Sequence, residues 1–452
     1  MHPAIRSIEF PEDILCADIA TTLFPTGTAV WLDAGVSATT GRSVLGTGSS
    51  VVTASGSVPG VRVNGRPRLL NVFDFLDSQQ SIVPEYTGFP FGWAGWLGYE
   101  TGVAALGLPT HRDVADDTAF VLLDRLVVVD HDRECVTLAA TESAPPKWID
   151  ESVHALRHAR GAAERYVRDA DLANPPQEVS WRHSEETYRT MIARCTDAIT
   201  SGDAYQVCLT TMAQAPTGAD PLSVALRLRV ENPSRRGGFF WIAGQSLVSS
   251  SPEEFLTIDE RGTIRTRPIK GTRPRGQTVA EDVRLRLDLE QSVKERAENV
   301  MIVDLMRNDL NRVCTRGSVA VRALCEVESY AHVHQLVSTV TGTLSDDSSA
   351  VDALRACFPA GSMTGAPKES ALRLLYQLEG GPRGAYAGCH GLLAHDGSAQ
   401  FSMTIRSIQF CDGVARVGSG GGITALSNSD DEVAEVRLKA DAVVRAAGLT
   451  IS

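Results

Sequence analysis

The chain has 452 residues with a formal net charge of −12, and 43% of its residues are hydrophobic. This length and composition allow a large buried core, and no apolar run approaches membrane-spanning length, which argues against a transmembrane protein. The acidic balance disfavours a nucleic-acid partner but leaves small anionic substrates open, because these respond to local charge.

The first residues and the cysteines both indicate a cytoplasmic protein. The start, M-H-P-A-I-R-S-I-E-F, lacks the apolar stretch of a signal peptide, so secretion is not expected. The nine cysteines are scattered singly without a C-x-x-C pair, which indicates reduced thiols and argues against a zinc site.

Residues 1–171 are predicted to form an N-terminal portion of mixed strands and turns with a charged helix near 151–168. Its segments include V-W-L-D-A-G from Val30, L-L-N-V-F-D-F-L from Leu69 and a glycine-aromatic run at 88–100, which is typical of turns at a sheet edge. A polar segment with two prolines predicts a linker at 172–184. Strands and helices then alternate over residues 185–452.

A cluster of cations lies at residues 267–276, which read R-P-I-K-G-T-R-P-R-G. It sets Lys270 among Arg267, Arg273 and Arg275. Neighbouring cations favour a neutral amine that can attack an electrophilic carbon, while the guanidiniums can hold an anionic substrate. A basic turn with ordinary solvated charges is the alternative interpretation.

Two pairs of acidic residues have helical spacing further along the chain. The pairs are Glu295 with Glu298 and Glu432 with Glu435. Each pair shares one helix face, and facing helices that present acids inward make an oxygen-rich site suited to Mg²⁺. Structural roles fit as well, because Ser429 with Glu432 matches a capping box and Lys439 stands at ion-pair spacing from Glu435.

A glycine run, G-S-G-G-G-I, occupies residues 418–423. It has neither the Walker lysine nor dinucleotide-binding spacing, so no nucleotide fingerprint is present. On local pattern alone it predicts a tight turn.

Seven strings occur in a fixed order over the second half of the chain. They are S-P-E-E-F-L (251–256), R-P-I-K-G-T-R-P-R-G (267–276), K-E-R-A-E-N-V-M-I-V-D-L-M-R-N-D (294–309), F-P-A-G-S-M-T-G-A-P-K (358–368), T-I-R-S-I (404–408), G-S-G-G-G-I (418–423) and D-E-V-A-E-V-R-L-K (431–439). Together they resemble the chorismate-using family that includes anthranilate synthase component I, aminodeoxychorismate synthase component I, isochorismate synthase and salicylate synthase. The resemblance runs from about Tyr188 to the C-terminus. It implies an α/β (α+β) fold in which two large, mainly antiparallel sheets pack face to face, with helices outside and the active site between them.

The resemblance also implies a role for each site residue. Glu253 would be the general acid that protonates the departing C4 hydroxyl of chorismate, a task that needs a raised pKa; a solvated acidic pair with Glu254 is the alternative. Glu298 and Glu435 would bind Mg²⁺ directly, with Glu295 and Glu432 in support. The residues implied in substrate binding are Gln206, Gly271, Thr272, Gln335, Ser362, Tyr386, Arg406, Gly420, Gly422 and Lys439.

Two positions bear on the choice of nucleophile within this family. Isochorismate and salicylate synthases carry a water-activating lysine where this chain has Gln206, which argues against water as the attacking group. Anthranilate synthases typically have alanine where Lys270 stands, whereas one subgroup of aminodeoxychorismate synthases has a lysine there as a covalent nucleophile. The resemblance therefore implies amination of chorismate to 4-amino-4-deoxychorismate through a lysine intermediate, for 4-aminobenzoate and folate synthesis.

Ammonia for this reaction is expected from a partner. The chain has no G-x-C-x-G elbow of a glutaminase, and adjacent Cys389 and His390 would point to opposite faces of a strand. We therefore expect a separate glutamine amidotransferase subunit.

Four positions depart from the family pattern. Gln335 stands where relatives have histidine, so either His334, after a one-residue backbone adjustment, or Gln335 itself would take that role. Cys208 replaces an asparagine and is expected to be a packed thiol. Ser362 replaces a threonine but keeps the hydroxyl, and Ala34 replaces a serine that helps anthranilate synthases bind feedback tryptophan, which argues against such inhibition.

Two alternative functions remain open from the sequence. The nearer is anthranilate synthase component I, which Lys270 disfavours. The more distant is a non-catalytic chorismate-binding paralogue, suggested by the missing histidine at Gln335.

Overall fold

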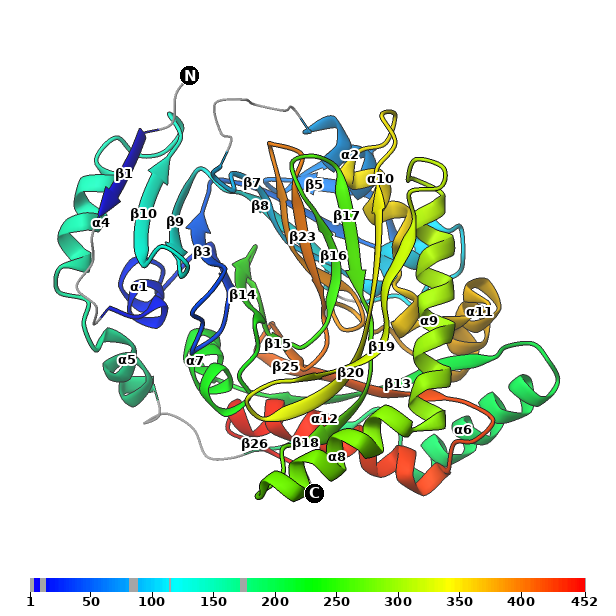
Figure 1. Cartoon of the computed structure of the whole chain (residues 1–452). Coiled ribbons are helices and arrows are strands. Elements are labelled where there is room, and N and C mark those ends of the chain that lie inside the picture. The colour runs from blue at the N-terminus through cyan, green and yellow to red at the C-terminus, as the bar shows by residue number, and fades with distance from the viewer. Residues whose placement is uncertain (1–3, 9–13, 81–87, 114, 171–176, 452) are drawn as a thin grey trace.

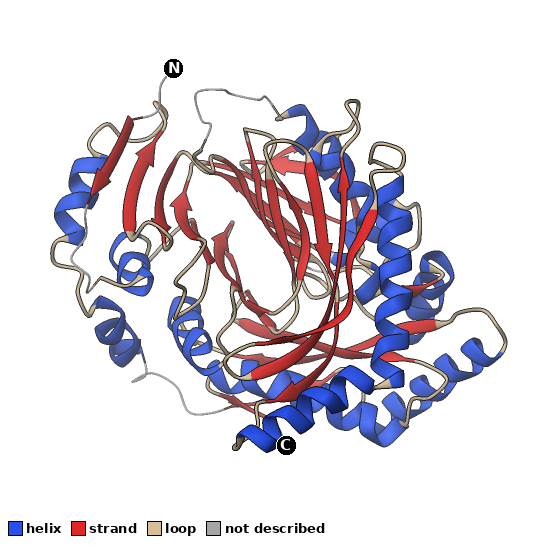
Figure 2. Cartoon of the chain, viewed as in Figure 1, coloured by secondary structure: helices blue, strands red, loops and turns tan. Residues whose placement is uncertain are grey.

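The computed structural model describes the chain except residues 1–3, 9–13, 81–87, 114, 171–176 and 452. Two large sheets occupy the middle of the molecule and helices lie around the outside (Figures 1 and 2). The pairings within both sheets are antiparallel throughout the described residues, including those of the short strands. The predicted architecture of two packed antiparallel sheets flanked by helices is confirmed.

The first sheet mixes strands from both ends of the chain. In spatial order it contains β1 (Ala4–Ile8), β10 (Cys135–Ala140), β9 (Arg125–Asp130), β3 (Arg42–Thr47), β2 (Ala29–Asp33), β14 (Arg236–Ile242), β15 (Gln245–Ser251), β24 (Ser407–Cys411), β25 (Val414–Ile423), β13 (Gln206–Pro216) and β12 (Ser180–Trp181), with β21 (Gly365–Ala366) pairing to β13.

The second sheet is mixed in the same way. Its order is β18 (Ile269–Pro274), β20 (Val333–Thr343), β17 (Thr263–Arg267), β16 (Glu254–Ile258), β23 (Ala399–Met403), β22 (Cys389–Ala394), β7 (Gly92–Leu97), β8 (Thr118–Leu122), β4 (Ser50–Ser55), β5 (Val58–Val63) and β6 (Arg66–Arg68), with β19 (Ala320–Ser329) pairing to β20. A separate parallel pair joins β11 (Gln177–Glu178) to β26 (Leu449–Thr450).

The helices cover the outer faces of the sheets. They are α1 (Cys16–Leu23), α2 (Val72–Ser78), α3 (Tyr99–Ala105), α4 (Trp148–Leu156), α5 (Ala162–Ala170), α6 (Glu185–Thr200), α7 (Pro221–Glu231), α8 (Val279–Gln291), α9 (Val293–Asn311), α10 (Ala350–Cys357), α11 (Lys368–Glu379) and α12 (Ser429–Ala446), with a 3₁₀ turn η2 (Gly361–Met363). Side-chain oxygens cap several of them as propensity predicts, for example Ser292 at α9 and Thr278 at α8. Among the described residues, no helix combines the length and apolarity needed to cross a bilayer.

Apolar side chains fill the space between the sheets as well as the space beneath the helices. Between the sheets, Val30 and Phe240 of the first sheet pack against Trp96 of the second, and the Trp96 and Phe240 rings meet edge to face at 6.2 Å. Strands from before residue 172 contribute to both sheets. The N-terminal portion therefore shares its sheets and core with the rest of the chain. The division at a 172–184 linker stays a prediction, because part of that segment lies outside the described residues.

Two local predictions in the N-terminal portion are wrong. The run at 88–100 was expected to form edge turns, but Gly92–Leu97 is β7, an interior strand between β22 and β8. Its glycines permit close strand contact, since a Cβ on Gly95 would lie 2.0 Å from the Ala119 carbonyl oxygen. Residues from Val72 form helix α2 instead of a strand, because Asn71 caps it by accepting the Asp74 amide hydrogen bond.

Candidate active site

Four elements converge around the side chain of Lys270. The lysine lies on edge strand β18, and its Nζ is 3.9 Å from the Glu298 carboxylate on α9. A Cβ on Gly422 of β25 would lie 3.5 Å from both of these groups and 2.5 Å from the amide nitrogen of Gln206 on β13. The next residue, Gly271, has a φ of +75°, which a side chain would strain, at a bulge that redirects β18. We call Gln206, Lys270, Glu298 and Gly422 the lysine site.

The three arginines near Lys270 in the sequence each bind a carboxylate. The pairs are Arg267 with Glu328, Arg273 with Asp288 and Arg275 with Asp282. These acids come from β19 and α8, which pack beside β18. The guanidiniums that were expected to hold an anionic substrate are therefore paired with acids of the protein itself, and the charges are not simply solvated either. The nearest charged partner of the lysine is a carboxylate.

Glu253 lies in the gap between β15 and β16 and is buried, with 7% of its surface exposed. Burial raises the pKa of Glu253 to about 7, although the charge of Lys270 and a hydrogen bond from Ser362 oppose the rise. Neighbouring Glu254 is also buried and pairs with Arg236 and, at 2.7 Å, with Arg265. These two charges hold the pKa of Glu254 below its usual range against the effect of burial. A solvated acidic pair is therefore excluded. Glu253 is a buried acid that can hold a proton near neutral pH.

The two glutamate pairs face each other across helices α9 and α12. Three of the four glutamates have a lysine close by: Glu298 with Lys270 at 3.9 Å, Glu432 with Lys294 at 3.4 Å and Glu435 with Lys439 at 2.5 Å. The fourth, Glu295, is 3.7 Å from Arg273. Burial raises the pKa of Glu298, with smaller upward effects from Glu295 and Glu432. Lys294 of α9 thus reaches Glu432 of α12, and the charges of Glu295 and Glu432 both act on Glu298.

The start of α12 differs in detail from the sequence expectation. The helix is capped by Asn428, whose side chain accepts the backbone N–H groups of Asp430 and Asp431. The proposed capping box between Ser429 and Glu432 is therefore wrong, because the helix begins one residue earlier than that pattern requires. The Glu432 carboxylate instead accepts a hydrogen bond from the Ser427 hydroxyl at 2.7 Å. The expected ion pair between Glu435 and Lys439 is present.

The donor chemistry of these helices fits a hard divalent cation. Within the part of the chain that the structure describes, no three His, Cys, Asp or Glu side chains are close enough to hold a metal by themselves. Mg²⁺ does not require such a cage, since it is commonly bound by one or two carboxylates together with water and an anionic ligand. Burial acts to raise the pKa of both Glu298 and Glu435, and the positive charge of Lys270 acts to lower it, so both carboxylates lie within reach of that charge.

The glycine run forms an interior strand, so the tight-turn interpretation is wrong. Residues 418–423 of β25 pair with β13 along one edge, whereas β24 pairs only with residues 414–416 of β25. The Gly420 carbonyl accepts a hydrogen bond from Lys439 Nζ at 3.0 Å and so points away from β13. The N–H of Gly420, and that of Gly422 two residues on, point to the same edge. These backbone donors can therefore meet an anionic group.

Arg406 and Tyr386 lie beside this strand. Arg406 has a φ of +51°, an uncommon conformation for a residue with a side chain. Burial lowers the pKa of Arg406, against the effects of Tyr386 and Glu435. Tyr386 is buried against Gly418, where a Cβ would lie 2.0 Å from the tyrosine ring. The guanidinium, the phenol and the open strand edge are thus neighbours.

Adjacent His334 and Gln335 on β20 point to opposite faces of the sheet. His334 is buried, with Nδ1 2.7 Å from the Ser329 hydroxyl and Nε2 3.0 Å from Asp282 of α8. Both ring nitrogens are therefore occupied on the side that faces α8. Gln335 pairs in register with Thr272 of β18, and its side chain lies on the other face. The structure does not bring His334 to the lysine site.

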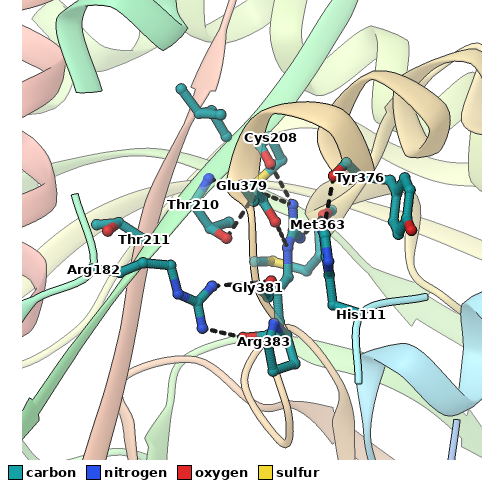
Figure 3. Close-up of polar contacts among 12 residues, drawn as sticks. His111, Arg182, Cys208, Thr210, Thr211, Met363, Tyr376, Glu379, Gly381 and Arg383 are labelled. Carbon is teal, nitrogen blue, oxygen red and sulfur yellow. Dashed lines mark hydrogen bonds and ion pairs between the residues drawn. The ribbon is translucent and has the colours of Figure 1, made fainter. Parts of the chain in front are cut away.

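A buried pair that sequence reasoning missed lies close behind β13. Arg383 and Glu379 bind each other and also contact backbone groups of Cys208, Thr210 and Met363 (Figure 3). Arg383 lies beyond the end of α11, which stops at Glu379, so helical spacing of opposite charges did not signal this pair. Cys208 is a buried thiol, as expected.

Comparison with known proteins shows which family this chain is similar to. The family described as chorismate binding enzyme matches residues 34–445. An aminodeoxychorismate synthase from Streptomyces pristinaespiralis is 42% identical over 389 residues, covering 83% of this chain and 54% of the relative. Anthranilate synthase component 1 from Streptomyces coelicolor is 36% identical over 378 residues, covering 80% of this chain and 74% of the relative. The chain spans about half the length of the aminodeoxychorismate synthase that it matches.

Solved structures show the same fold. Anthranilate synthase component I from Streptococcus pneumoniae superposes with a TM-score of 0.74 at 28% identity, covering 89% of this chain and 92% of that one. The similarity therefore extends over most of the length of both chains.

Proposed function

The chain belongs to the family of chorismate binding enzymes, and we propose that it converts chorismate and ammonia to 4-amino-4-deoxychorismate. The observation that carries this proposal is Lys270 at the centre of the lysine site, beside a buried acid and an open edge of backbone donors. The relative named aminodeoxychorismate synthase, at 42% identity, supports the same choice over anthranilate formation. The product would supply 4-aminobenzoate and folate synthesis after a separate lyase acts.

The proposed reaction has two displacements. The free amine of Lys270 forms a bond to ring C2, the ring double bond shifts, and the C4–O bond breaks. Glu253 donates its proton to the departing oxygen, which leaves as water. Ammonia then bonds to C4 as the ring double bonds shift back, the C2–N bond breaks, and its electron pair returns to the Lys270 nitrogen. The proton that the new ammonium group loses restores the acid form of Glu253. One hard displacement is thereby split into two easier ones, and the ring is not aromatised.

The remaining residues would bind and orient the substrate. Arg406, Tyr386 and the backbone N–H groups of Gly420 and Gly422 would hold anionic and polar groups of chorismate. Gln335, Ser362 and Thr272 lie on elements bordering the lysine site, and Gln335 pairs in register with Thr272 of β18. Both ring nitrogens of His334, the other candidate for the role of the family histidine, are already engaged. We therefore assign that role to Gln335 and not to His334.

Mg²⁺ would be held by Glu298 and Glu435, with Glu295 and Glu432 in support. When bound, the ion would fix the ring carboxylate of chorismate and polarise the ring. Its positive charge would also offset the mutual repulsion of carboxylates that Lys270, Lys294 and Lys439 partly balance in the structure.

We expect Glu298→Gln to weaken Mg²⁺ binding about 100-fold or more, because loss of a direct ligand should exceed the 10–100-fold cost typical of outer partners. Titration with Mn²⁺ monitored by electron paramagnetic resonance, in the absence of substrate and with chorismate added, measures this directly. Glu369→Gln is the matched control, since Glu369 pairs with Arg373 on the exposed surface of α11. Equal cation affinity in the wild type and Glu298→Gln would contradict the assignment.

Ammonia would come from a separate glutamine amidotransferase subunit. Cys389 and His390 are both buried in β22, and burial raises the pKa of the Cys389 thiol well above its usual value. Burial also lowers the pKa of His390 to about 4. This pair therefore lacks the accessible, activated thiol that a glutaminase needs. Free ammonium should replace the partner in vitro.

The test of the proposed function is product analysis by mass-resolved chromatography. The purified chain is incubated with chorismate, Mg²⁺ and ammonium at mildly alkaline pH, with and without an added aminodeoxychorismate lyase. We expect 4-aminobenzoate only when the lyase is present. Anthranilate would overturn the proposal in favour of tryptophan synthesis. Chorismate that binds but stays unchanged would favour the non-catalytic alternative.

A further inference from the structure

Arg383 and Glu379 form an ion pair that is almost completely withdrawn from solvent. Their side chains are 1% and 4% exposed, and both carboxylate oxygens of Glu379 accept guanidinium hydrogen bonds, at 2.7 and 2.8 Å. The Tyr99 ring lies 4.2 Å from the guanidinium carbon. Burying two charges is costly unless every donor and acceptor is satisfied. A pair of this kind is therefore a rigid point in the structure.

The same guanidinium joins two backbone segments that are far apart in sequence. It donates to the Met363 carbonyl of η2 at 2.7 Å and to the Cys208 carbonyl of β13 at 2.8 Å (Figure 3). Glu379 completes the link, because its carboxylate accepts the Thr210 N–H at 2.8 Å and the Thr210 hydroxyl at 2.9 Å. Arg383 thus fixes η2 against β13.

Each of these segments carries a residue of the proposed site. Ser362 precedes Met363 in η2, and its side chain lies close enough to Glu253 to act on the pKa of that acid, which it lowers. Cys208 follows Gln206 by two residues on β13 and stands opposite Gly422. A shift of the Met363 carbonyl would therefore move Ser362 relative to the acid. No contact joins Arg383 to Lys270 or Glu253 directly among the described residues.

We propose that Arg383, oriented by Glu379, is a positioning residue that holds Ser362 against Glu253 and so tunes the proton donor of the reaction. This inference rests on the proposed role of Glu253 as general acid. A lysine at 383 would keep the positive charge. It could not donate two hydrogen bonds to Glu379 and also reach the Met363 and Cys208 carbonyls, because its donors share one nitrogen atom. The interaction is thus specific to the guanidinium.

The test is a double-mutant cycle between Arg383→Lys and Ser362→Ala, measured on chorismate turnover. We expect Arg383→Lys to lower kcat by about 10- to 100-fold with little change in KM, since small misplacements of catalytic groups have effects of that size. Ser362→Ala should lower kcat as well. If Arg383 acts through Ser362, the double variant is no slower than the slower single variant. Multiplicative effects would contradict the proposal.

Arg229→Lys is the matched control. Arg229 also forks onto a carboxylate, Asp33, at 2.7 and 3.3 Å and donates to the Gly35 carbonyl at 3.0 Å, but it touches no residue of the proposed site. Its effect on kcat should be small and should multiply with that of Ser362→Ala. A purely structural role for buried arginines would make the two Arg→Lys variants behave alike.

A second readout does not depend on turnover. Infrared difference spectroscopy follows the carbonyl stretch of protonated Glu253, assigned as the band that Glu253→Gln removes. Lys270 is the charged group that acts on Glu253, and it is retained in every variant. Because the Ser362 hydrogen bond favours the ionised form, its loss should raise the titration midpoint in both Ser362→Ala and Arg383→Lys. The midpoint in Arg229→Lys should stay at the wild-type value.

The outcomes separate this inference from the proposed function. A raised midpoint in Arg383→Lys supports the positioning role even if the product assay yields anthranilate. An unchanged midpoint overturns it even if 4-amino-4-deoxychorismate is made. Should Arg383→Lys fail to fold, Glu379→Gln provides the same test, because it keeps an oxygen acceptor for the guanidinium while removing one arm of the carboxylate fork.

Discussion

Replacing Lys270 by alanine is expected to abolish formation of 4-amino-4-deoxychorismate, with a loss of about 10³-fold or more in kcat, because the first displacement then has no nucleophile. Chorismate affinity should change much less, since the carboxylates of the substrate are assigned to Arg406 and to the backbone of β25. The measurement is product formation at saturating ammonia together with direct titration of chorismate binding.

A charge-conserving variant of Lys270 distinguishes its role as a nucleophile from its role as a positive charge beside Glu298. Lys270→Arg keeps a cation next to Glu298, which lies 3.9 Å from the lysine amine, but a guanidinium is not a nucleophile at ordinary pH. It should be as inactive as Lys270→Ala while retaining more of the wild-type stability. Substantial aminodeoxychorismate formation by either variant would contradict a covalent role for the lysine.

Glu253→Gln is expected to lower kcat by about 10²- to 10⁴-fold, the usual contribution of a positioned proton donor. In the wild type, only the protonated form of Glu253 is active, so at saturating ammonia kcat should fall as the pH rises through about 7, the pKa that burial gives this acid. Glutamine cannot titrate, and this decline should be absent from the residual activity of the variant. A pH–rate profile over both sides of neutrality measures it.

The neighbouring residue supplies the control for that variant. Glu254→Gln removes a buried carboxylate that pairs with Arg236 and Arg265, so it should reduce stability. Its pH–rate profile should keep the wild-type decline, because Glu254 takes no part in proton transfer. A profile that loses the decline in Glu254→Gln and keeps it in Glu253→Gln would reverse the assignment of the acid.

The order of motifs was enough to predict the fold. Helical spacing placed Glu295 with Glu298 and Glu432 with Glu435 on common faces, and the structure brings the two faces together. Local patterns failed where strand pairing decides the outcome. The glycine runs at 88–100 and 418–423 look like turns in isolation, yet both contain strands inside sheets. Strands distant in sequence can approach these glycines closely because they have no side chains.

Charge environments were the least predictable part of the site. The arginines flanking Lys270 are balanced by acids on α8 and β19, which only tertiary packing brings near. The side of the sheet on which His334 lies depends on the register of β20, and that register is set by contacts outside the motif. The Arg383–Glu379 pair is invisible for the same reason, since its burial depends on β13 and η2.

The covalent role of Lys270 is tested most directly by mass spectrometry of the enzyme after rapid acid quenching during turnover. The chain is mixed with chorismate and Mg²⁺ without ammonia, digested, and searched for a modified peptide. The account predicts a peptide containing Lys270 that is heavier by chorismate less one water, and this species should disappear when ammonium is added before the quench. An unmodified Lys270 peptide in an enzyme that still makes 4-amino-4-deoxychorismate would contradict it.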